Sequence, residues 1–174
     1  MTLRDAVPLD AASIVAIYNH YVTTTSVSFE EAEVAAAEMA ARIEAIQASG
    51  LPWYVATDGD RTLGYAYASR WRSRSAYRYA AEVTVYVAAG QGAKGAGSAL
   101  YRLLLPTLRE RGFHTALATI ALPNPASIAF HERFGFRKAG HVSQVGFKEN
   151  RWVDVGYWQL MLQSPVPEAA SGGR

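Results

Sequence analysis

A glycine-rich turn in the middle of the chain has the residue types that bind an anion. The β-branched run 83–87 predicts a strand, Gly92, Gly95 and Gly97 follow it, and an apolar helical pattern begins near Ser98. Glycine has no Cβ, so its backbone can approach a ligand closely. The start of a helix adds unpaired N–H groups and the positive end of the helix dipole. The pattern therefore predicts a turn that cradles a phosphate-bearing group.

Two common phosphate-binding motifs are excluded by the residues around this turn. A P-loop places Ser or Thr after its lysine, whereas Lys94 is followed by Gly95. A dinucleotide-binding fold ends its next strand with an acidic residue for the ribose, but the predicted strand 113–122 contains neither Asp nor Glu. What remains is the pattern G-x-x-G-x-G over residues 92–97, between a strand and a helix.

This turn resembles the pyrophosphate loop of the GCN5-related N-acetyltransferase (GNAT) superfamily. The segments Ile17–Val22 and Leu122–Phe136 carry the same resemblance, which covers the chain from Leu3 to about Leu162 and narrows to the phosphinothricin and methionine sulfoximine acetyltransferase branch. The family loop usually begins with Gln or Arg, whereas this chain has glycine there and Gln91 one place earlier. That departure leaves backbone cradling intact and puts in doubt only the contact of the missing side chain.

The resemblance implies acetyl-coenzyme A as acetyl-donor cosubstrate and a single-domain α/β (α+β) GNAT fold, in which helices flank a mixed, mostly antiparallel twisted sheet. We expect the domain to cover residues 1–163 and the tail 164–174 to be disordered. The resemblance assigns coenzyme binding to the end of one strand, the turn, and the starts of two helices. These residues are Val85, Tyr86, Val87, Gln91, Gly92, Ala93, Lys94, Gly95, Ala96, Gly97, Ser98, Asn124 and Ser127.

Acetyl transfer to an amine needs a base, because an amine is mostly protonated at neutral pH. Glu82 is the only acid in the strand that leads into the glycine turn, and partial burial there would make its carboxylate more basic. The alternative is a solvated strand residue, since every second side chain of a strand can face water. The resemblance, in which a Glu at this position lies beside the acceptor amine, favours the catalytic interpretation.

After transfer the coenzyme thiolate leaves and takes up a proton. His131 occupies the position where the wider superfamily commonly has a Tyr that supplies it, so His131 is the candidate general acid. A His in the second turn of a helix can equally contact the coenzyme or fill space. Asn124 has two compatible roles, as a helix cap on physical grounds and as a coenzyme contact by resemblance.

Acceptor recognition is expected in the arginine-rich segment 69–77. Arg72 and Arg74 are two residues apart in an extended segment, so their forked donors can address one carboxylate or phosphinate together. The resemblance points to the same pair and adds Tyr77 and Phe29, although Arg70 can share the task and a loop arginine is often only solvated. The aromatic residues Tyr77, Tyr79, Tyr86 and Trp152 either line this pocket or belong to the core.

Composition favours small-molecule chemistry in one domain. The 174 residues are 50% hydrophobic, carry a formal net charge of +2 and contain no cysteine. This length buries one ordinary core, and the small charge with no Lys/Arg block argues against nucleic-acid or membrane partners. No run is apolar enough to span a bilayer, residues 1–8 are not a signal leader, and a cytoplasmic location is expected. Without a cysteine thiol to carry the acetyl group, direct transfer in a ternary complex is favoured, and no metal is expected.

Local signals predict the elements in chain order. We expect a strand at 3–6, a helix capped by Asp10 to about residue 22, and a second helix from a Ser28–Glu31 capping box to Ala48. Strands 53–57 and 62–71 flank a hairpin turn, and strand 81–87 precedes the turn. A helix follows with Leu100, Leu103, Leu104 and Leu108 on one face and Pro106 inside it, then a helix begun by Pro125 and strands 140–147 and 151–162.

Together these features predict an acetyl-coenzyme A-dependent N-acetyltransferase acting on the α-amine of a small amino-acid analogue. By resemblance, the acceptors are phosphinothricin, methionine sulfoximine or methionine sulfone, and the chain forms a homodimer. Two alternatives stay open. One is a protein N-terminal or lysine acetyltransferase with an open peptide groove, and the other is a catalytically silent coenzyme A-binding module.

Overall fold

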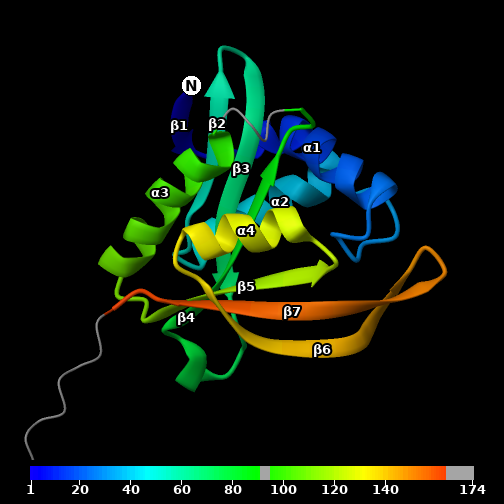
Figure 1. Cartoon of the computed structure of the whole chain (residues 1–174). Coiled ribbons are helices and arrows are strands. Elements are labelled where there is room, and N and C mark those ends of the chain that lie inside the picture. Colours follow the sequence, from blue (N-terminus) through cyan, green and yellow to red (C-terminus); the bar gives the residue numbers. More distant parts are fainter. Residues whose placement is uncertain (91–94, 164–174) are drawn as a thin grey trace, which may run out of the picture.

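The structure is a computed structural model that describes residues 1–90 and 95–163, and in this part of the chain seven strands form one mixed sheet (Figure 1). Its spatial order is β1-β2-β3-β4-β5-β7-β6. The strands are β1 Thr2–Asp5, β2 Trp53–Asp58, β3 Arg61–Arg70, β4 Ala80–Val87, β5 Thr115–Leu122, β6 Arg137–Lys148 and β7 Arg151–Met161. The helices are α1 Ala11–Thr24, α2 Ala36–Ala48, α3 Ala96–Glu110 and α4 Pro125–Arg133, with short 3-10 turns at Pro8–Asp10 and Ser75–Tyr77. The expected flanked, mostly antiparallel sheet is confirmed.

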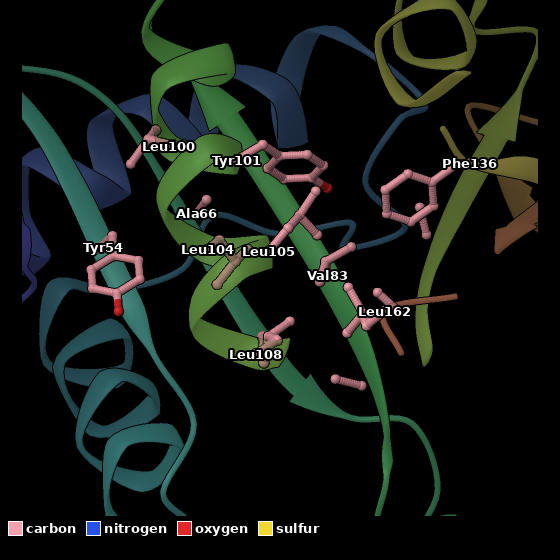
Figure 2. Packing of buried hydrophobic residues seen from close by; sticks show 14 of the residues in the cluster. Tyr54, Ala66, Val83, Leu100, Tyr101, Leu104, Leu105, Leu108, Phe136 and Leu162 are labelled. Atoms are coloured by element: carbon pink, nitrogen blue, oxygen red, sulfur yellow. The ribbon is translucent and has the colours of Figure 1, made fainter. Parts of the chain in front are cut away.

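The helices cover the two faces of the sheet in pairs (Figure 1). Helices α3 and α4 lie on one face and α1 and α2 on the other. Figure 2 shows Leu100, Leu104 and Leu108 of α3 turned toward the strands, where all three are fully buried. Burying a leucine contributes about 1.5–3 kcal/mol, so this stripe fixes α3 on the sheet. Leu103, predicted on the same face, is only half-buried, and Leu105 is buried instead.

The sheet opens at its one parallel pair. Strands β4 and β5 are joined only between residues 80–82 and 115–117, and β5 pairs along its whole length with β7 on its other side. Beyond Glu82 the two strands are therefore no longer paired with each other. This opening in the middle of the sheet is where the functional cleft forms.

Helix α1 begins directly after Asp10 as predicted, whereas the predicted start of α2 at Ser28 is wrong, and in both places the side chain predicted to cap the helix has another partner. The Asp10 carboxylate accepts hydrogen bonds from Arg4 at 2.7 Å and from the Val7 N–H at 2.8 Å, so it holds the connection before α1 instead of capping that helix. The Ser28 hydroxyl lies 2.8 Å from the Tyr18 hydroxyl. Consequently residues 28–35 form a loop, and α2 begins at Ala36.

The remaining predicted elements are present with small shifts at their ends. The 53–58 and 61–70 strands form the expected hairpin, and Pro106 lies inside α3. Strand β6 begins at Arg137, earlier than expected. Among the described residues, the helices are too short or too polar to cross a membrane. The turn residues 91–94 and the tail 164–174, both subjects of sequence predictions, lie outside the described residues.

Candidate active site

A cleft of about 660 Å³ occupies the opening between β4 and β5. Both faces of β4 contribute, because Val83, Val85 and Val87 point to the α3 side while Glu82 and Thr84 point to the α1 side. The cleft therefore passes through the sheet. It has one end beside the starts of α3 and α4 and another beside α1 and the loop that follows α1.

The start of α3 forms one side of the first end. Gly95 is the N-cap and has φ of +80°, a left-handed conformation that favours glycine. Gly97 and Ser98 in the first turn line the cleft. A Cβ on Gly97 would lie 3.4 Å from both Val87 and Phe130, so a larger residue would crowd the wall. Together with the helix dipole, the free N–H groups of this first turn favour an anion at this position.

The exposed edge of β4 supplies backbone groups to the cleft. The Ala88 N–H donates to the Leu63 carbonyl of β3 at 2.8 Å, and alternation then turns the polar groups of Val85 and Val87 toward the opening. The Val87 carbonyl already accepts a hydrogen bond from the Tyr21 hydroxyl at 2.7 Å. One of its lone pairs is therefore occupied, while Val85 has no such partner among the described side chains.

The start of α4 forms the opposite side of the same end. Asn124 caps the helix as predicted, because its Oδ1 accepts from the Ser127 N–H at 3.1 Å. Both residues line the cleft, together with Phe130 and Arg133. Two helix starts thus converge on the cleft, and this donor set fits the negatively charged and amide-bearing chain of a coenzyme.

His131 lines the cleft, but both of its ring nitrogens already have partners. Nδ1 lies 2.8 Å from the Ser127 carbonyl oxygen, which can only accept, so Nδ1 carries the hydrogen. Nε2, 2.9 Å from the Tyr101 hydroxyl, is then the acceptor in the neutral ring. Burial lowers the pKa of His131, against a smaller opposing effect of the Ser127 hydrogen bond. This geometry favours the space-filling interpretation of His131 over the general-acid one.

Glu82 stands where the two strands separate. It is the last residue of β4 paired with β5, opposite Leu117, and it also pairs with Ser69 of β3. Its side chain is half-buried in the cleft wall. The neighbouring Tyr67 hydroxyl has its pKa raised, mainly by burial and further by the negative charge of Glu82. A carboxylate therefore sits at the boundary between the two ends of the cleft, as a base for an incoming amine requires.

The loop after α1 forms the second end, and a buried lysine holds it in place. Val27, Ser28 and Phe29 line the cleft. The Lys148 ammonium of β6 is buried and donates to the carbonyls of Val22 and Ser28, each at 2.7 Å. The carbonyl of Val22 belongs to the last turns of α1, where a cation also interacts favourably with the helix dipole.

The β6–β7 hairpin also presses on Phe29 directly. A Cβ added to Gly146 would lie 2.4 Å from the Phe29 ring, so a larger residue there would displace this ring. Arg151 of the same hairpin donates to the Ser26 hydroxyl at 2.8 Å. In Figure 1 this hairpin reaches outward from the sheet toward the loop after α1. The second end of the cleft is thus assembled from parts that are far apart in the sequence.

The predicted acceptor residues are not all brought together. Phe29 lines the cleft, whereas Arg72, Arg74 and Tyr77 lie in the exposed connection between β3 and β4, outside the cleft wall. The Arg72 guanidinium stacks on the Trp71 ring, with 4.3 Å to the ring centroid. This connection joins the end of β3 that carries Ser69 to the start of β4 that carries Glu82. The two arginines therefore lie in sequence between these paired residues.

Of the aromatic residues predicted for the pocket or the core, some line the cleft and others do not. Tyr86 lines the cleft as expected. Tyr79 and Trp152 are 52% and 61% exposed and do not line it; Tyr79 stacks with Arg78, and Trp152 packs against Phe147 of the hairpin. Neither alternative given for these two residues holds, because both are exposed, Tyr79 in the turn before β4 and Trp152 on the surface of β7.

Several lining residues were not predicted. Tyr18 and Tyr21 of α1 and Tyr67 of β3 line the cleft, and Lys148 supports the loop at its second end. The tyrosines at positions 18 and 21 share a helix face and lie in a segment that carries the family resemblance, which is the signal that could have identified them. Lys148 gives no such signal. Within the described ranges, no three His, Cys, Asp or Glu side chains are grouped to hold a metal ion.

The structure thus has a mixed sheet opened at one parallel pair, with two helix starts and a carboxylate at the opening. The family model described as the acetyltransferase (GNAT) domain matches residues 3–156, and the chain belongs to this family. It is therefore an acetyltransferase of the GNAT type.

The relatives agree with this assignment over nearly the whole chain. A phosphinothricin N-acetyltransferase of Streptomyces viridochromogenes is 36% identical over 165 residues, 95% of this chain and 90% of the relative. An L-methionine sulfoximine/L-methionine sulfone acetyltransferase of Pseudomonas paraeruginosa is 38% identical, covering 92% of this chain and 94% of the relative. The solved phosphinothricin acetyltransferase of Sinorhizobium meliloti in complex with acetyl-CoA has a TM-score of 0.89 at 37% identity, covering 98% of this chain and 95% of that one.

Proposed function

We propose that this chain transfers acetyl from acetyl-coenzyme A to the α-amine of a small amino-acid analogue such as phosphinothricin, methionine sulfoximine or methionine sulfone. The observation that carries the proposal is the position of Glu82 at the point where β4 and β5 separate, between the two ends of one cleft. The printed activities of the relatives support the acceptor class.

The proposed transfer is a single direct step. The amine, after losing a proton to Glu82, attacks the thioester carbonyl; the carbon–nitrogen bond forms, the carbon–sulfur bond breaks, and the coenzyme leaves as a thiolate. The 174 residues contain no cysteine, so no acetylated thiol intervenes. Both substrates must then occupy the cleft together. The neutral, doubly hydrogen-bonded His131 is not needed for this step, because a thiolate leaves readily without prior protonation and then takes its proton from water.

The anionic part of the acceptor is assigned to the connection between β3 and β4. Arg72 and Arg74 present forked donors that match a carboxylate or phosphinate. They are exposed and follow the strand that carries Ser69, the partner of Glu82. Tyr77 and Phe29 complete this proposed set, with Phe29 already in the cleft wall.

The test is thiol release from acetyl-coenzyme A against phosphinothricin, methionine sulfoximine, methionine sulfone, ordinary amino acids and short peptides. Saturable turnover with the free amino-acid analogues alone supports the proposal. Turnover only with peptides indicates a protein acetyltransferase, and coenzyme binding without turnover indicates a silent binding module. Either of these results overturns it.

A matched pair of variants tests the arginine assignment. Arg72→Ala is expected to raise the apparent KM for the acceptor strongly, whereas Arg102→Ala, at an exposed position on α3, is not. Unchanged kinetics in Arg72→Ala would remove this residue from the acceptor site while leaving the enzyme assignment intact.

We also propose a cytoplasmic homodimer, on the family resemblance. The β6–β7 hairpin exposes Val145, Phe147 and Trp152 at 53%, 50% and 61%, an apolar surface compatible with a second copy. Light scattering of the purified protein should give twice the mass of one chain, and a monomer at micromolar concentration would contradict the dimer.

A further inference from the structure

An aromatic ring just beyond β3 lies on the same face of the sheet as Glu82. The Trp71 N–H donates to the Ala80 carbonyl of β4 at 3.4 Å, so the chain is still paired with β4 after β3 ends. Trp71 is two residues from Ser69, which pairs with Glu82, and alternate residues of an extended chain share a face. Diagonal neighbours of this kind lie about 7–8 Å apart, within reach of a long side chain. Trp71 and Glu82 are therefore neighbours on one face.

A second ring reaches Trp71 from the other side of Glu82. Tyr157 of β7 pairs with Thr119 of β5, which lines the cleft. The Trp71 and Tyr157 ring centroids are 5.7 Å apart and their planes are inclined by 83°, an edge-to-face contact. Because β4 and β5 lie between β3 and β7 in the sheet, the two rings can meet only by leaning across both strands. The register places this contact next to the pair formed by Glu82 and Leu117.

The Trp71 ring also carries one of the predicted acceptor residues. The Arg72 guanidinium carbon lies 4.3 Å from the centroid of this ring. An aromatic face attracts a guanidinium and leaves its forked donors free to bind an anion. Arg74, two residues further on, stacks on no aromatic ring within residues 1–90 and 95–163. The exposed Arg72 is thus held near β4 by its neighbour, whereas Arg74 has no such support.

The proposed reaction needs a base and a cation close together. An α-amino acid carries its amine and its carboxylate on the same carbon, so an amine at Glu82 brings a carboxylate to the same place. A guanidinium already stacked on Trp71 is restrained, so less side-chain entropy is lost when it binds that carboxylate. The arrangement of Glu82, Trp71 and Arg72 therefore suits an acceptor with a free α-carboxylate.

We propose that Trp71 is a positioning residue that holds the Arg72 guanidinium for the α-carboxylate of the acceptor, and that Tyr157 supports the Trp71 ring. The inference rests on the proposed function, because it takes the acceptor amine to be at Glu82. It separates the two arginines, since Arg72 has the aromatic support and Arg74 does not. It also predicts that acceptors without a free carboxylate are poor substrates.

The first experiment measures the kinetics of Trp71→Leu with methionine sulfone. Loss of the stack should raise the apparent KM for this acceptor about three- to tenfold, while kcat and the KM for acetyl-coenzyme A stay close to wild type. Trp71→Phe keeps an aromatic face and should restore most of the affinity. Tyr79→Leu is the matched control, because it removes the stack of Arg78 on Tyr79, at 4.5 Å, from the same connection between β3 and β4. It should leave both KM values unchanged.

Two changes at Tyr157 test the support of the Trp71 ring. Tyr157→Leu should raise the acceptor KM by a smaller factor than Trp71→Leu, because the stack of Arg72 can still form. Tyr157→Phe should have no effect, since an edge-to-face contact needs the ring and not the hydroxyl. An unchanged acceptor KM in Tyr157→Leu would overturn this supporting role.

A double-mutant cycle separates positioning from simple packing. If Trp71 acts through Arg72, Trp71→Leu should raise the acceptor KM no further in a protein that already carries Arg72→Ala. The carboxamide of methionine sulfone gives the same separation from the substrate side. It lacks the carboxylate, so it should be a poor acceptor, and Trp71→Leu should not lower its kcat/KM further.

The outcomes separate this role from the proposed function. Equal increases in acceptor KM with and without Arg72 overturn the inference, as do equal losses with methionine sulfone and its carboxamide. An unchanged KM in Trp71→Leu also overturns it, and so does a parallel rise in the KM for acetyl-coenzyme A, which indicates a general loss of structure. In each of these cases the proposed function stands. Absence of turnover by the wild type with every acceptor overturns the proposed function, and the inference with it.

Discussion

The two ends of the cleft are built in different ways. The end beside the starts of α3 and α4, which we call the coenzyme end, consists of backbone groups and helix starts. Each is defined by neighbouring residues, such as Gly95 before α3 and Asn124 before α4. The end beside α1 and the loop that follows it, which we call the acceptor end, is held by side chains from distant parts of the chain. Lys148 bonds carbonyls that are 126 and 120 residues away, and Asn19 bonds both the N–H and the carbonyl of Val34 at 3.0 Å.

This difference predicts which end of the cleft tolerates changes of side chain. A backbone cradle depends on chain conformation and tolerates changes in most side chains around it. The acceptor loop depends on a few buried partners, so single changes there should alter acceptor binding while leaving coenzyme binding intact. Glu82 belongs to both ends, and its loss should have the largest effect.

Glu82→Gln tests the boundary between the two ends. If Glu82 is the proposed base, its removal should lower kcat by about 10²- to 10⁴-fold, since the amide cannot take up the amine proton. Coenzyme affinity, measured by calorimetry, should stay close to wild type. Glu44→Gln, at an exposed α2 position, is the matched control. Wild-type turnover in Glu82→Gln would assign the base to another group.

Lys148→Met tests whether the acceptor end is supported separately. The change deletes two charge-assisted hydrogen bonds of 2.7 Å and leaves the carbonyls of Val22 and Ser28 without this donor. We expect a stability loss of about 1.5–3 kcal/mol, measured by denaturant unfolding. The apparent KM for methionine sulfone should rise several-fold, and that for acetyl-coenzyme A should not.

Two further variants control for a general loss of structure. Lys138→Met changes an exposed lysine of the same strand and should leave both KM values unchanged. Gly146→Ala, which collides with Phe29, should repeat the acceptor effect, whereas Gly140→Ala meets only an ordinary contact of 3.6 Å and should not. Parallel increases in both KM values for Lys148→Met would show that the two ends are not independent.

Asn124→Ala tests the coenzyme end, where we expect the reverse of the KM changes predicted for Lys148→Met. Losing the helix cap should destabilise the protein by about 1 kcal/mol, seen as a lower Tm. The KM for acetyl-coenzyme A should rise while that for the acceptor stays unchanged. Asn124→Ser, which keeps a capping oxygen, should restore most of the stability. A rise confined to the acceptor KM would contradict the assignment of Asn124 to the coenzyme end.

The smallest expected effect concerns the pH dependence of His131. Burial lowers its pKa in the folded protein, so below about pH 6.5 the unfolded chain binds a proton that the folded chain does not. Stability from this group is therefore complete above about pH 6.5 and is lost as pH falls through the folded pKa. His131→Gln should show a smaller drop in Tm between pH 7.5 and 5.5, and parallel curves would contradict this assignment.

Several elements of the fold could be predicted from the sequence because their signals are local. The cap by Asn124, the strand before the glycine turn and the hairpin 53–70 each follow from residues within a few positions of one another. Ser28 shows the limit of such signals. Its spacing from Glu31 fits a helix start, but Tyr18 takes its hydroxyl, and no local pattern encodes that competition.

The acceptor end could be predicted only in part. Arg72 and Arg74 are predicted from residue type, spacing and the family resemblance, which say nothing of whether a side chain faces the cleft, and neither residue lines it. Lys148 was missed because a lysine in a strand ordinarily suggests an exposed edge, and its two carbonyl partners come together only in the folded chain. Long-range contacts of this kind need the structure.

The most direct test of the account is the initial-velocity pattern with acetyl-coenzyme A and methionine sulfone varied together. One cleft that holds both substrates with Glu82 between them predicts double-reciprocal lines that intersect, since transfer occurs in a ternary complex. Parallel lines would mean that acetyl passes first to the protein, and would contradict direct transfer.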